Sequence, residues 1–229
     1  MYDESDSRGG ALCEILWADS QEFGSKQSLS AEDQELARTF LFQPRRRQFE
    51  TGRTLVRRFF SQKLGLSPEN LRIAVDATGK PFLLAEGLGL PYQFSIAHSG
   101  RIVVCAFSKD IRLGVDIERV RRSYDWLRTA CAVLTADEIN TLLAYSPSRR
   151  ARAFYKLWTK NEALAKATRT GISQTVRSRR KSAVEVGKPD VSGWTSAPVK
   201  TRSSYVGTVV VESVTCRFET RQEHLTSNT

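Results

Sequence analysis

The sequence Gly114-Val115-Asp116-Ile117-Glu118, in the middle of the chain, alternates apolar and acidic residues. Successive side chains of a β-strand point to opposite faces, so Asp116 and Glu118 share one face and the apolar residues share the other. Two carboxylates on one face of an apolar strand repel each other and require a cation or solvent. Mg²⁺ suits them, because it typically binds one or two carboxylates together with phosphate oxygens. The alternative is a solvent-exposed edge strand, and the short pattern alone does not decide between the two.

A second motif, Trp158-Thr159-Lys160-Asn161-Glu162-Ala163-Leu164-Ala165-Lys166, falls on a long helix predicted from Ser148 to about Thr168. Glu162 and Lys166 have i,i+4 spacing and therefore share a helix face. We expect Trp158, one turn earlier, to pack into the core and fix the rotation of the helix. A surface ion pair is the simplest interpretation of Glu162 and Lys166. The functional interpretation is a third carboxylate that faces Asp116 and Glu118, with a lysine for a phosphate.

Strands and helices alternate through the rest of the chain, which predicts an α+β or α/β fold. The predicted strands are Leu12–Trp17, Leu71–Val75, Gln93–Ala97, Ile102–Phe107, Leu113–Glu118, Ala183–Val186, Val206–Val211 and Val214–Phe218. The predicted helices are Ser30–Phe42, which Pro44 ends, then about Arg46–Leu64, a short helix behind a Thr135/Glu138 capping box, and Ser148–Thr168, which Gly171 ends. The buried side of the first helix is expected to carry Leu36, Ala37, Phe40 and Leu41.

Three cations upstream of the acidic strand are candidates for binding a phosphate. His98 follows a predicted strand in the turn His98-Ser99-Gly100, where backbone amides can also bind anions. Lys80 lies in the turn Gly79-Lys80-Pro81, and Arg53 lies on the predicted Arg46–Leu64 helix. The alternative for His98 is a structural hydrogen bond, and for the other two it is a solvated surface position.

Composition narrows the class of protein and of partner. The chain has 229 residues, a formal net charge of +10 and a sequence pI of about 9.7. A basic surface favours polyanions, which include nucleic acid, phosphorylated ligands and acidic proteins. The acidic, polar start Met1–Gly10 is unlike a secretory signal, and no apolar run is long enough to span a bilayer. Four widely spaced cysteines without metal-ligand spacing indicate reduced thiols, so we expect a cytoplasmic protein.

In order and spacing, these pieces resemble the Sfp-type 4′-phosphopantetheinyl transferases over roughly residues 11–172. That family shows an arginine-bearing helix, a GKP turn, an SHS-like turn, a G-[VI]-D-[IV]-E strand and a W-x-x-K-E-[AS]-x-x-K helix. The resemblance implies an α+β fold in which two similar α/β-type subdomains of one chain pack together as a pseudo-dimer. Because both subdomains belong to the same chain, the protein is expected to be a monomer. The implied units are a loose tail at 1–10, a first subdomain at 11–110 and a second at 111–229, of which 173–229 matches poorly.

The resemblance also implies the activity and the roles of the residues. Coenzyme A would be the co-substrate, and its 4′-phosphopantetheine group would pass to a serine of an acidic acyl, peptidyl or aryl carrier protein, with 3′,5′-ADP as the other product. The implied binding residues for the coenzyme are Arg53, Gly79, Lys80 and His98, of which Arg53, Lys80 and His98 would hold its 3′-phosphate side. The implied Mg²⁺ ligands are Asp116, Glu118 and Glu162, and the implied catalytic residues are Glu162 as base and Lys166.

The chain departs from the family pattern at three positions, and two other classes of protein stay open. Asn161 stands where the family has lysine, Arg169 where it has the first glycine after the helix, and Ala97 where it has serine. The first two departures support an inactive relative that acts as a scaffold. Arginine runs such as Arg45–Arg47 and Arg177–Lys181 favour a nucleic-acid-binding module, but such a module leaves the same-face acids of Gly114–Glu118 unexplained.

Overall fold

The computed structural model describes residues 11–22, 29–76, 79–85, 88–121, 125–170 and 193–224, and it confirms the predicted α+β class. The helices are α1 (Ala31–Arg38), α2 (Gln43–Leu64), α3 (Trp126–Val133), α4 (Ala136–Ala144) and α5 (Pro147–Thr168). The strands are β1 (Ala11–Asp19), β2 (Leu71–Val75), β3 (Pro81–Ala85), β4 (Leu88–Gly89), β5 (Tyr92–Ser99), β6 (Ile102–Lys109), β7 (Leu113–Arg119), β8 (Thr195–Pro198), β9 (Tyr205–Val211) and β10 (Cys216–Gln222).

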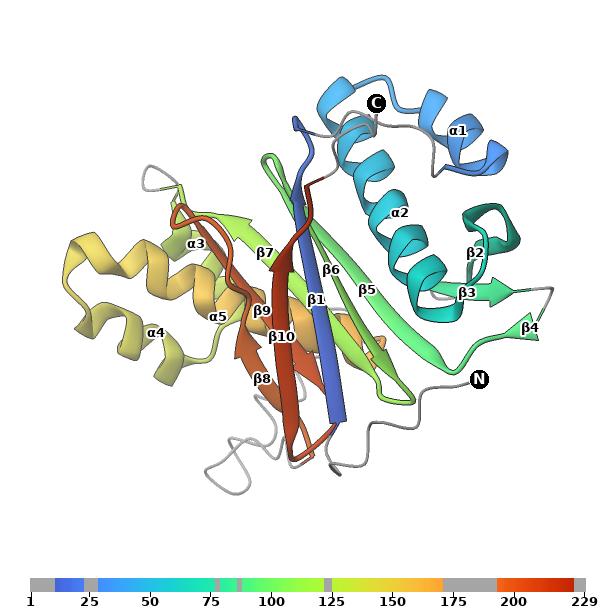
Figure 1. Cartoon of the computed structure of the whole chain (residues 1–229). Helices are drawn as coiled ribbons and strands as arrows, with labels where there is room; N and C mark the ends of the chain where they lie inside the picture. Colours follow the sequence, from blue (N-terminus) through green and yellow to red (C-terminus); the bar gives the residue numbers. More distant parts are fainter. Residues whose placement is uncertain are drawn as a thin grey trace.

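Two sheets form the centre of the molecule, and helices lie on either side of them (Figure 1). The first sheet has the strand order β10-β1-β6-β5, and the second has the order β7-β9-β8. A small third sheet, β2-β3-β4, lies beside α2. In Figure 1, α1 and α2 occupy one side of the central strands, while α3, α4 and α5 occupy the other. This arrangement matches the expected two α/β-type halves.

Strands β1 and β6 are apolar on both faces because both faces are buried. Alternate residues of β6, such as Val103 and Cys105, join a core with the phenylalanines of α2. The intervening residues, such as Val104 and Ala106, join a second core with β7 and β9. Side chains alternate along a strand, so a strand with two buried faces needs an apolar residue at nearly every position. The continuous apolar runs in the sequence therefore mark the middle layers of the fold.

Serine side chains connect the two halves where β5 runs beside β7. Ser95 Oγ accepts a hydrogen bond of 3.2 Å from the Val115 amide, and Ser99 Oγ accepts one of 3.0 Å from the Arg119 amide. The last strand crosses back to the first half, because β10 pairs with β1 in parallel, with Ala11 opposite Cys216. The division of the chain into 11–110 and 111–229 stays a prediction.

Most predicted helices and strands are present, but several of their boundaries differ from the prediction. Pro44 lies in the first turn of α2, where a missing amide hydrogen costs nothing, so it begins that helix rather than only ending the previous one. Helix α1 stops at Arg38, which leaves Leu41 beyond it and almost fully exposed, and Leu36 is also exposed. The Thr135/Glu138 capping box is confirmed at the start of α4.

The C-terminal end of α5 also differs from the prediction. The helix ends at Thr168, and Arg169 takes the left-handed conformation of the C-cap, with φ 60° and ψ 21°. The predicted terminator, Gly171, lies outside the described residues, as do the tail at 1–10, the strand predicted at 183–186 and the arginine run at 177–181. In the ranges that the structure describes, no helix has the length and apolar character needed to cross a membrane.

Gly114 brings the backbones of β7 and α5 into direct contact. A Cβ atom added there would lie 2.1 Å from the Ala163 carbonyl oxygen and 2.9 Å from the Lys166 Cβ. Real Cβ atoms do not approach that closely, so the helix would have to move. The face of β7 that carries Gly114 therefore also faces α5, and Asp116 and Glu118 share that face.

We expect Gly114→Ala to destabilise the protein by about 3 kcal/mol, the upper end for overpacking a core. For a chain of this size that loss lowers Tm by roughly 6–12 °C. Calorimetry measures it, and Gly89→Ala in β4 is the control, because a Cβ there meets no atom within 4 Å. An unchanged Tm in Gly114→Ala would show that α5 does not rest directly on β7.

Candidate active site

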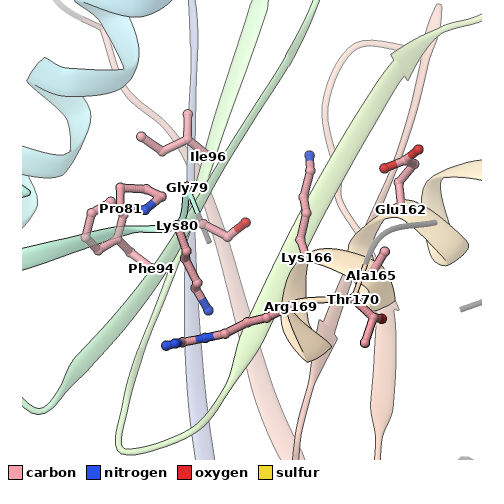
Figure 2. A pocket seen from close by; sticks show the side chains of 11 residues that line it. Gly79, Lys80, Pro81, Phe94, Ile96, Glu162, Ala165, Lys166, Arg169 and Thr170 are labelled. Atoms are coloured by element: carbon pink, nitrogen blue, oxygen red, sulfur yellow. The ribbon is translucent and has the colours of Figure 1, made fainter. Parts of the chain in front are cut away.

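A cleft of about 400 Å³ lies between the end of α5 and strands β3 and β5 (Figure 2). Figure 2 shows Lys80 on one wall and Glu162, Lys166 and Arg169 on the helix that forms the other. The cleft is lined by Gly79, Lys80, Pro81, Phe94, Ser95, Ile96, Glu162, Ala165, Lys166, Arg169 and Thr170. The structure thus brings together residues from the GKP turn and from the Trp158–Lys166 motif, which are far apart in the sequence.

The acidic face of β7 meets Lys166 of α5. Lys166 Nζ lies 2.8 Å from Asp116 Oδ1 and donates a second hydrogen bond of 3.0 Å to the Val115 carbonyl. The ion-pair partner of Lys166 is therefore Asp116 on the neighbouring strand, although Glu162 has the favourable i,i+4 spacing. Glu118 accepts a 2.7 Å hydrogen bond from Ser99 Oγ. These contacts support the prediction that the same-face acids of β7 turn toward α5 rather than toward solvent.

Three carboxyl groups near this contact have raised pKa values. Burial is the main cause of the raised pKa of Asp116, and the positive charge of Lys166 opposes it. Burial also raises the pKa of Glu118, and the negative charge of Asp116 adds to the effect. The pKa of Glu162 is raised by burial and by the negative charges of Asp116 and Glu118. The three groups therefore act on one another electrostatically, and one lysine does not compensate their combined negative charge.

The acids fit a hard divalent cation. Asp116 Oδ2 is buried and has no hydrogen-bond partner among the described residues, so it can accept a ligand without first losing a contact. Mg²⁺ requires only one or two carboxylates when phosphate oxygens and waters complete its shell. In the described part of the chain, Asp116, Glu118 and Glu162 do not form a group of three side chains arranged to hold a metal ion. A phosphate-bearing ligand would have to supply part of the coordination.

Lys80 is the cation on the opposite wall of the cleft. Its ammonium is buried and makes no hydrogen bond within the described residues. Burial, with the positive charge of Arg169 as a second cause, lowers its pKa to about 8. The Gly79-Lys80-Pro81 turn is held by Asp76, whose Oδ1 accepts from the Lys80 amide at 3.0 Å, and Gly79 adopts φ 84°. A buried ammonium without a partner favours a site for an anion.

Arg53 and His98 line a neighbouring cavity of about 190 Å³, separate from Lys80. The two cavities share Pro81 and Ile96, so they are adjacent. Arg53 Nε lies 3.4 Å from Asp33 Oδ1, and its guanidinium lies 5.2 Å from the centre of the Phe49 ring. Arg53 Nη1 is buried without a partner in the described ranges. The structure therefore does not place all three predicted phosphate-binding cations in one cavity.

The position of His98 differs from the prediction. His98 lies within β5, opposite Val103 of β6, and the turn begins only at Gly100, with φ 55°. The predicted strand ended too early because His and Ser are weaker strand signals than the apolar residues before them. In its actual place His98 Nδ1 lies 3.4 Å from Arg45 Nη1, which can donate to it.

We expect His98 to titrate with a pKa of about 4, because burial and the charges of Arg45 and Lys166 disfavour its protonated form. The unfolded state binds the proton more readily, so the contribution of His98 to stability falls as pH decreases from about 6.5 to about 4. Nuclear magnetic resonance of the imidazole measures the midpoint, and 3′,5′-ADP should raise it if a phosphate binds here. A midpoint near 6.5 without ligand would contradict the buried position.

Some residues of the site were missed by sequence reasoning. Arg45 lines the cavity of Arg53 and His98, but in the sequence it appeared only as part of a basic run. Arg45, Phe49 and Arg53 follow i,i+4 spacing, and that pattern could have placed them on one face of α2. The Ser99–Glu118 contact joins strands of the two halves and had no local signal.

The fold and the cleft together define an α+β protein that carries a charged cleft beside the contact of its two halves. Family models match both halves: 4′-phosphopantetheinyl transferase superfamily over residues 112–210, and 4′-phosphopantetheinyl transferase, N-terminal, over residues 17–110. The chain is 30% identical over 168 residues to 4′-phosphopantetheinyl transferase Sfp of Bacillus subtilis, which covers 71% of this chain and 72% of that protein. The chain belongs to the 4′-phosphopantetheinyl transferase superfamily, and the resemblance seen in the sequence is confirmed.

Other relatives match a smaller share of their own length. The chain is 28% identical over 147 residues to 4′-phosphopantetheinyl transferase HetI of Nostoc sp., with 64% of this chain and 62% of HetI covered. It is 32% identical over 123 residues to 4′-phosphopantetheinyl transferase AcpT of Escherichia coli, with 54% and 58% covered. The chain thus spans about 60% of the length of these two curated relatives.

Proposed function

We propose that this protein transfers the 4′-phosphopantetheine group of coenzyme A to a serine of an apo carrier protein, with Mg²⁺ as cofactor. The observation that carries the proposal is the cleft in which Lys80, Lys166 and Glu162 converge beside the buried, unpartnered oxygen of Asp116. The cleft thus combines cations that suit phosphates with carboxylates that suit a metal. Family membership indicates that the reaction at such a site is phosphopantetheine transfer.

The two adjacent cavities suggest how the coenzyme is bound. The 3′-phosphate is assigned to the cavity of Arg53 and His98, to which the structure adds Arg45. The diphosphate is assigned to the cleft that Gly79, Lys80 and Lys166 line. Lys80 was expected beside the 3′-phosphate, but its place in the larger cleft favours the diphosphate instead. Asp116, Glu118 and Glu162 would hold Mg²⁺, which supplies charge neutralisation on the phosphate oxygens.

The reaction is a displacement at phosphorus. A bond forms between the serine Oγ and the phosphorus that carries pantetheine, and the bond from that phosphorus to the oxygen of 3′,5′-ADP breaks. Glu162 takes the serine proton, directly or through a water, and its raised pKa suits a base. Lys166, which lines the cleft, would lie near the reacting phosphate and would stabilise the charge that develops on its oxygens.

The partner is an acidic acyl, aryl or peptidyl carrier protein, and the net charge of +10 favours the encounter by electrostatic steering. We propose a cytoplasmic monomer that binds neither nucleic acid nor membrane. Part of the basic run that favoured nucleic acid is otherwise engaged: Arg45 lies against His98, and Arg46 Nε lies 3.0 Å from Glu50 Oε1.

Incubation with coenzyme A, Mg²⁺ and an apo carrier protein tests the proposal. Intact-mass spectrometry should show the carrier gain one phosphopantetheine group, and chelation of the metal should prevent the gain. No gain with fatty-acid, polyketide and peptide carriers would favour the inactive relative. Retention on heparin that salt reverses steeply, with no mass gain, would instead favour the nucleic-acid-binding alternative.

A further inference from the structure

Arg169 adopts a left-handed backbone conformation, which residues other than glycine and asparagine rarely adopt. It is the C-cap of α5 with φ 60°, a position where glycine is strongly preferred. The left-handed conformation costs an ordinary L-residue free energy, and residues that keep such strain cluster at ligand sites. An arginine here is therefore a reason to ask what its side chain does.

The side chain of Arg169 crosses the cleft from the end of α5 toward the turn that carries Lys80. Figure 2 shows its guanidinium at the end of the Lys80 side chain, although the two residues come from opposite walls. Arg169 Nη1 lies 3.1 Å from Asp76 Oδ2, and the other oxygen of Asp76 accepts from the Lys80 amide. Asp76 thus holds the guanidinium beside the GKP turn.

This arrangement gathers more positive than negative charge. Burial and then the positive charge of Arg169 lower the pKa of Lys80, and Asp76 contacts both residues. The buried Lys80 ammonium has no hydrogen-bond partner in the described ranges, and Asp76 engages only one edge of a guanidinium that has five donors. A phosphate bound between the two cations would satisfy both and relieve their repulsion.

We propose that Arg169 is a phosphate-binding residue that, with Lys80, clamps the diphosphate of coenzyme A across the cleft. The inference rests on the proposed function, which supplies the ligand, and deepens it by adding a residue outside the predicted set. It also explains why arginine stands where the family has glycine. The left-handed C-cap is less favourable for arginine, but the arginine adds a cation to the side of the cleft that α5 forms. Arginine suits this role because its fork of donors can contact two phosphate oxygens at once.

The alternative is a purely structural role, in which Arg169 only ties α5 to the GKP turn through Asp76. Asp76→Asn separates the two roles, because the amide oxygen still accepts from Lys80 while the ion pair with Arg169 is lost. Arg169→Gln removes the cation and keeps a side chain of similar length in the same backbone conformation. Arg217→Gln removes one exposed positive charge on β10, a strand that contributes no residue to either cavity, and serves as the charge control.

Isothermal calorimetry with Mg²⁺ tests the inference with coenzyme A and with dephospho-coenzyme A as probes. We expect Arg169→Gln to weaken the binding of both probes by about tenfold or more, the usual effect of one charge-assisted contact. Arg169→Lys should recover part of the loss, and Asp76→Asn, which leaves the Arg169 cation in place, should weaken binding by less than Arg169→Gln does. Arg217→Gln should change the Kd by less than about twofold.

Each result that would overturn the inference is distinct. If Arg169→Gln binds coenzyme A like the wild type, Arg169 does not contact the ligand. If Asp76→Asn weakens binding as much as Arg169→Gln, the role of Arg169 is structural. If the loss appears with coenzyme A but not with dephospho-coenzyme A, Arg169 binds the 3′-phosphate instead. If the wild type binds neither probe, the proposed function fails and the inference fails with it.

Discussion

Asp116→Asn is expected to reduce phosphopantetheine transfer by at least about a thousandfold while the protein stays folded. A metal ion that neutralises charge on the reacting phosphate contributes several kcal/mol to the transition state, and about 4 kcal/mol corresponds to this factor. Among the proposed metal ligands we choose Asp116, because its Oδ2 is buried without a partner in the described ranges and its Oδ1 lies against Lys166.

The fold should tolerate this change for an electrostatic reason. Burial raises the pKa of Asp116, which means that the charged carboxylate is less favourable in the folded protein than in water. At neutral pH a neutral amide of the same shape removes that cost, and its oxygen can still accept from Lys166. Tm should therefore change little or increase, although the loss of the Lys166 ion pair offsets part of the gain.

Asp110→Asn is the matched control. Asp110 is exposed in the turn before β7 and has φ 59°, a conformation that asparagine tolerates well. It should transfer at the wild-type rate. Near-normal transfer by Asp116→Asn at low Mg²⁺, in a protein with unchanged circular dichroism, would show that Asp116 is not a metal ligand.

How much of the fold could be predicted depended on periodicity. The face of β7 that carries Asp116 and Glu118 followed from strict alternation, and the α2 and α5 helices followed from their apolar spacing. The strand β8 and the helix α3 were missed. β8 has only four residues, one of them proline, and α3 has only eight residues, so each offers a short window for a periodic pattern. The parallel pairing of β10 with β1 joins the two ends of the chain and has no local signature.

The site shows the same division. Asp116, Glu162 and Lys166 could be found because each lies in a motif with strand or helix spacing. Arg169 was first interpreted only as a departure from a glycine, since the sequence does not show that its side chain reaches Asp76 across the cleft. Likewise, the separation of Arg53 and Lys80 into two cavities depends on how α2 packs against β5, which is a tertiary property.

Glu162→Gln tests whether Glu162 is the general base or only part of a structural ion pair. The two interpretations predict transfer rates that differ by orders of magnitude. We expect transfer at saturating coenzyme A and Mg²⁺ to fall by about 10²–10⁴, the usual contribution of a general base, and further if Glu162 also binds the metal. A structural i,i+4 pair with Lys166 would lose only a few tenths of a kcal/mol on this change.

The structure favours the base over the structural pair. Lys166 pairs with Asp116, and among the described residues Glu162 makes no hydrogen bond or ion pair. Trp158 is partly buried against Phe154, with ring centres 6.1 Å apart, which helps to set the rotation of α5. That rotation places Glu162 in the lining of the cleft (Figure 2). Glu162 is therefore held in the cleft without a structural contact to maintain.

The measurement for Glu162→Gln is the initial rate of holo-carrier formation, with circular dichroism to show that the variant is folded. Glu219→Gln on β10 is the control for the loss of one carboxylate, since the Glu219 side chain is 56% exposed and pairs with Arg217 on the same strand. Glutamine keeps the shape of glutamate and an oxygen that can accept a hydrogen bond, so substrate positioning is largely retained. A loss of less than about threefold in a folded variant would contradict the base assignment. Family membership would stand in that case, because it rests on the sequence matches and not on the identity of the base.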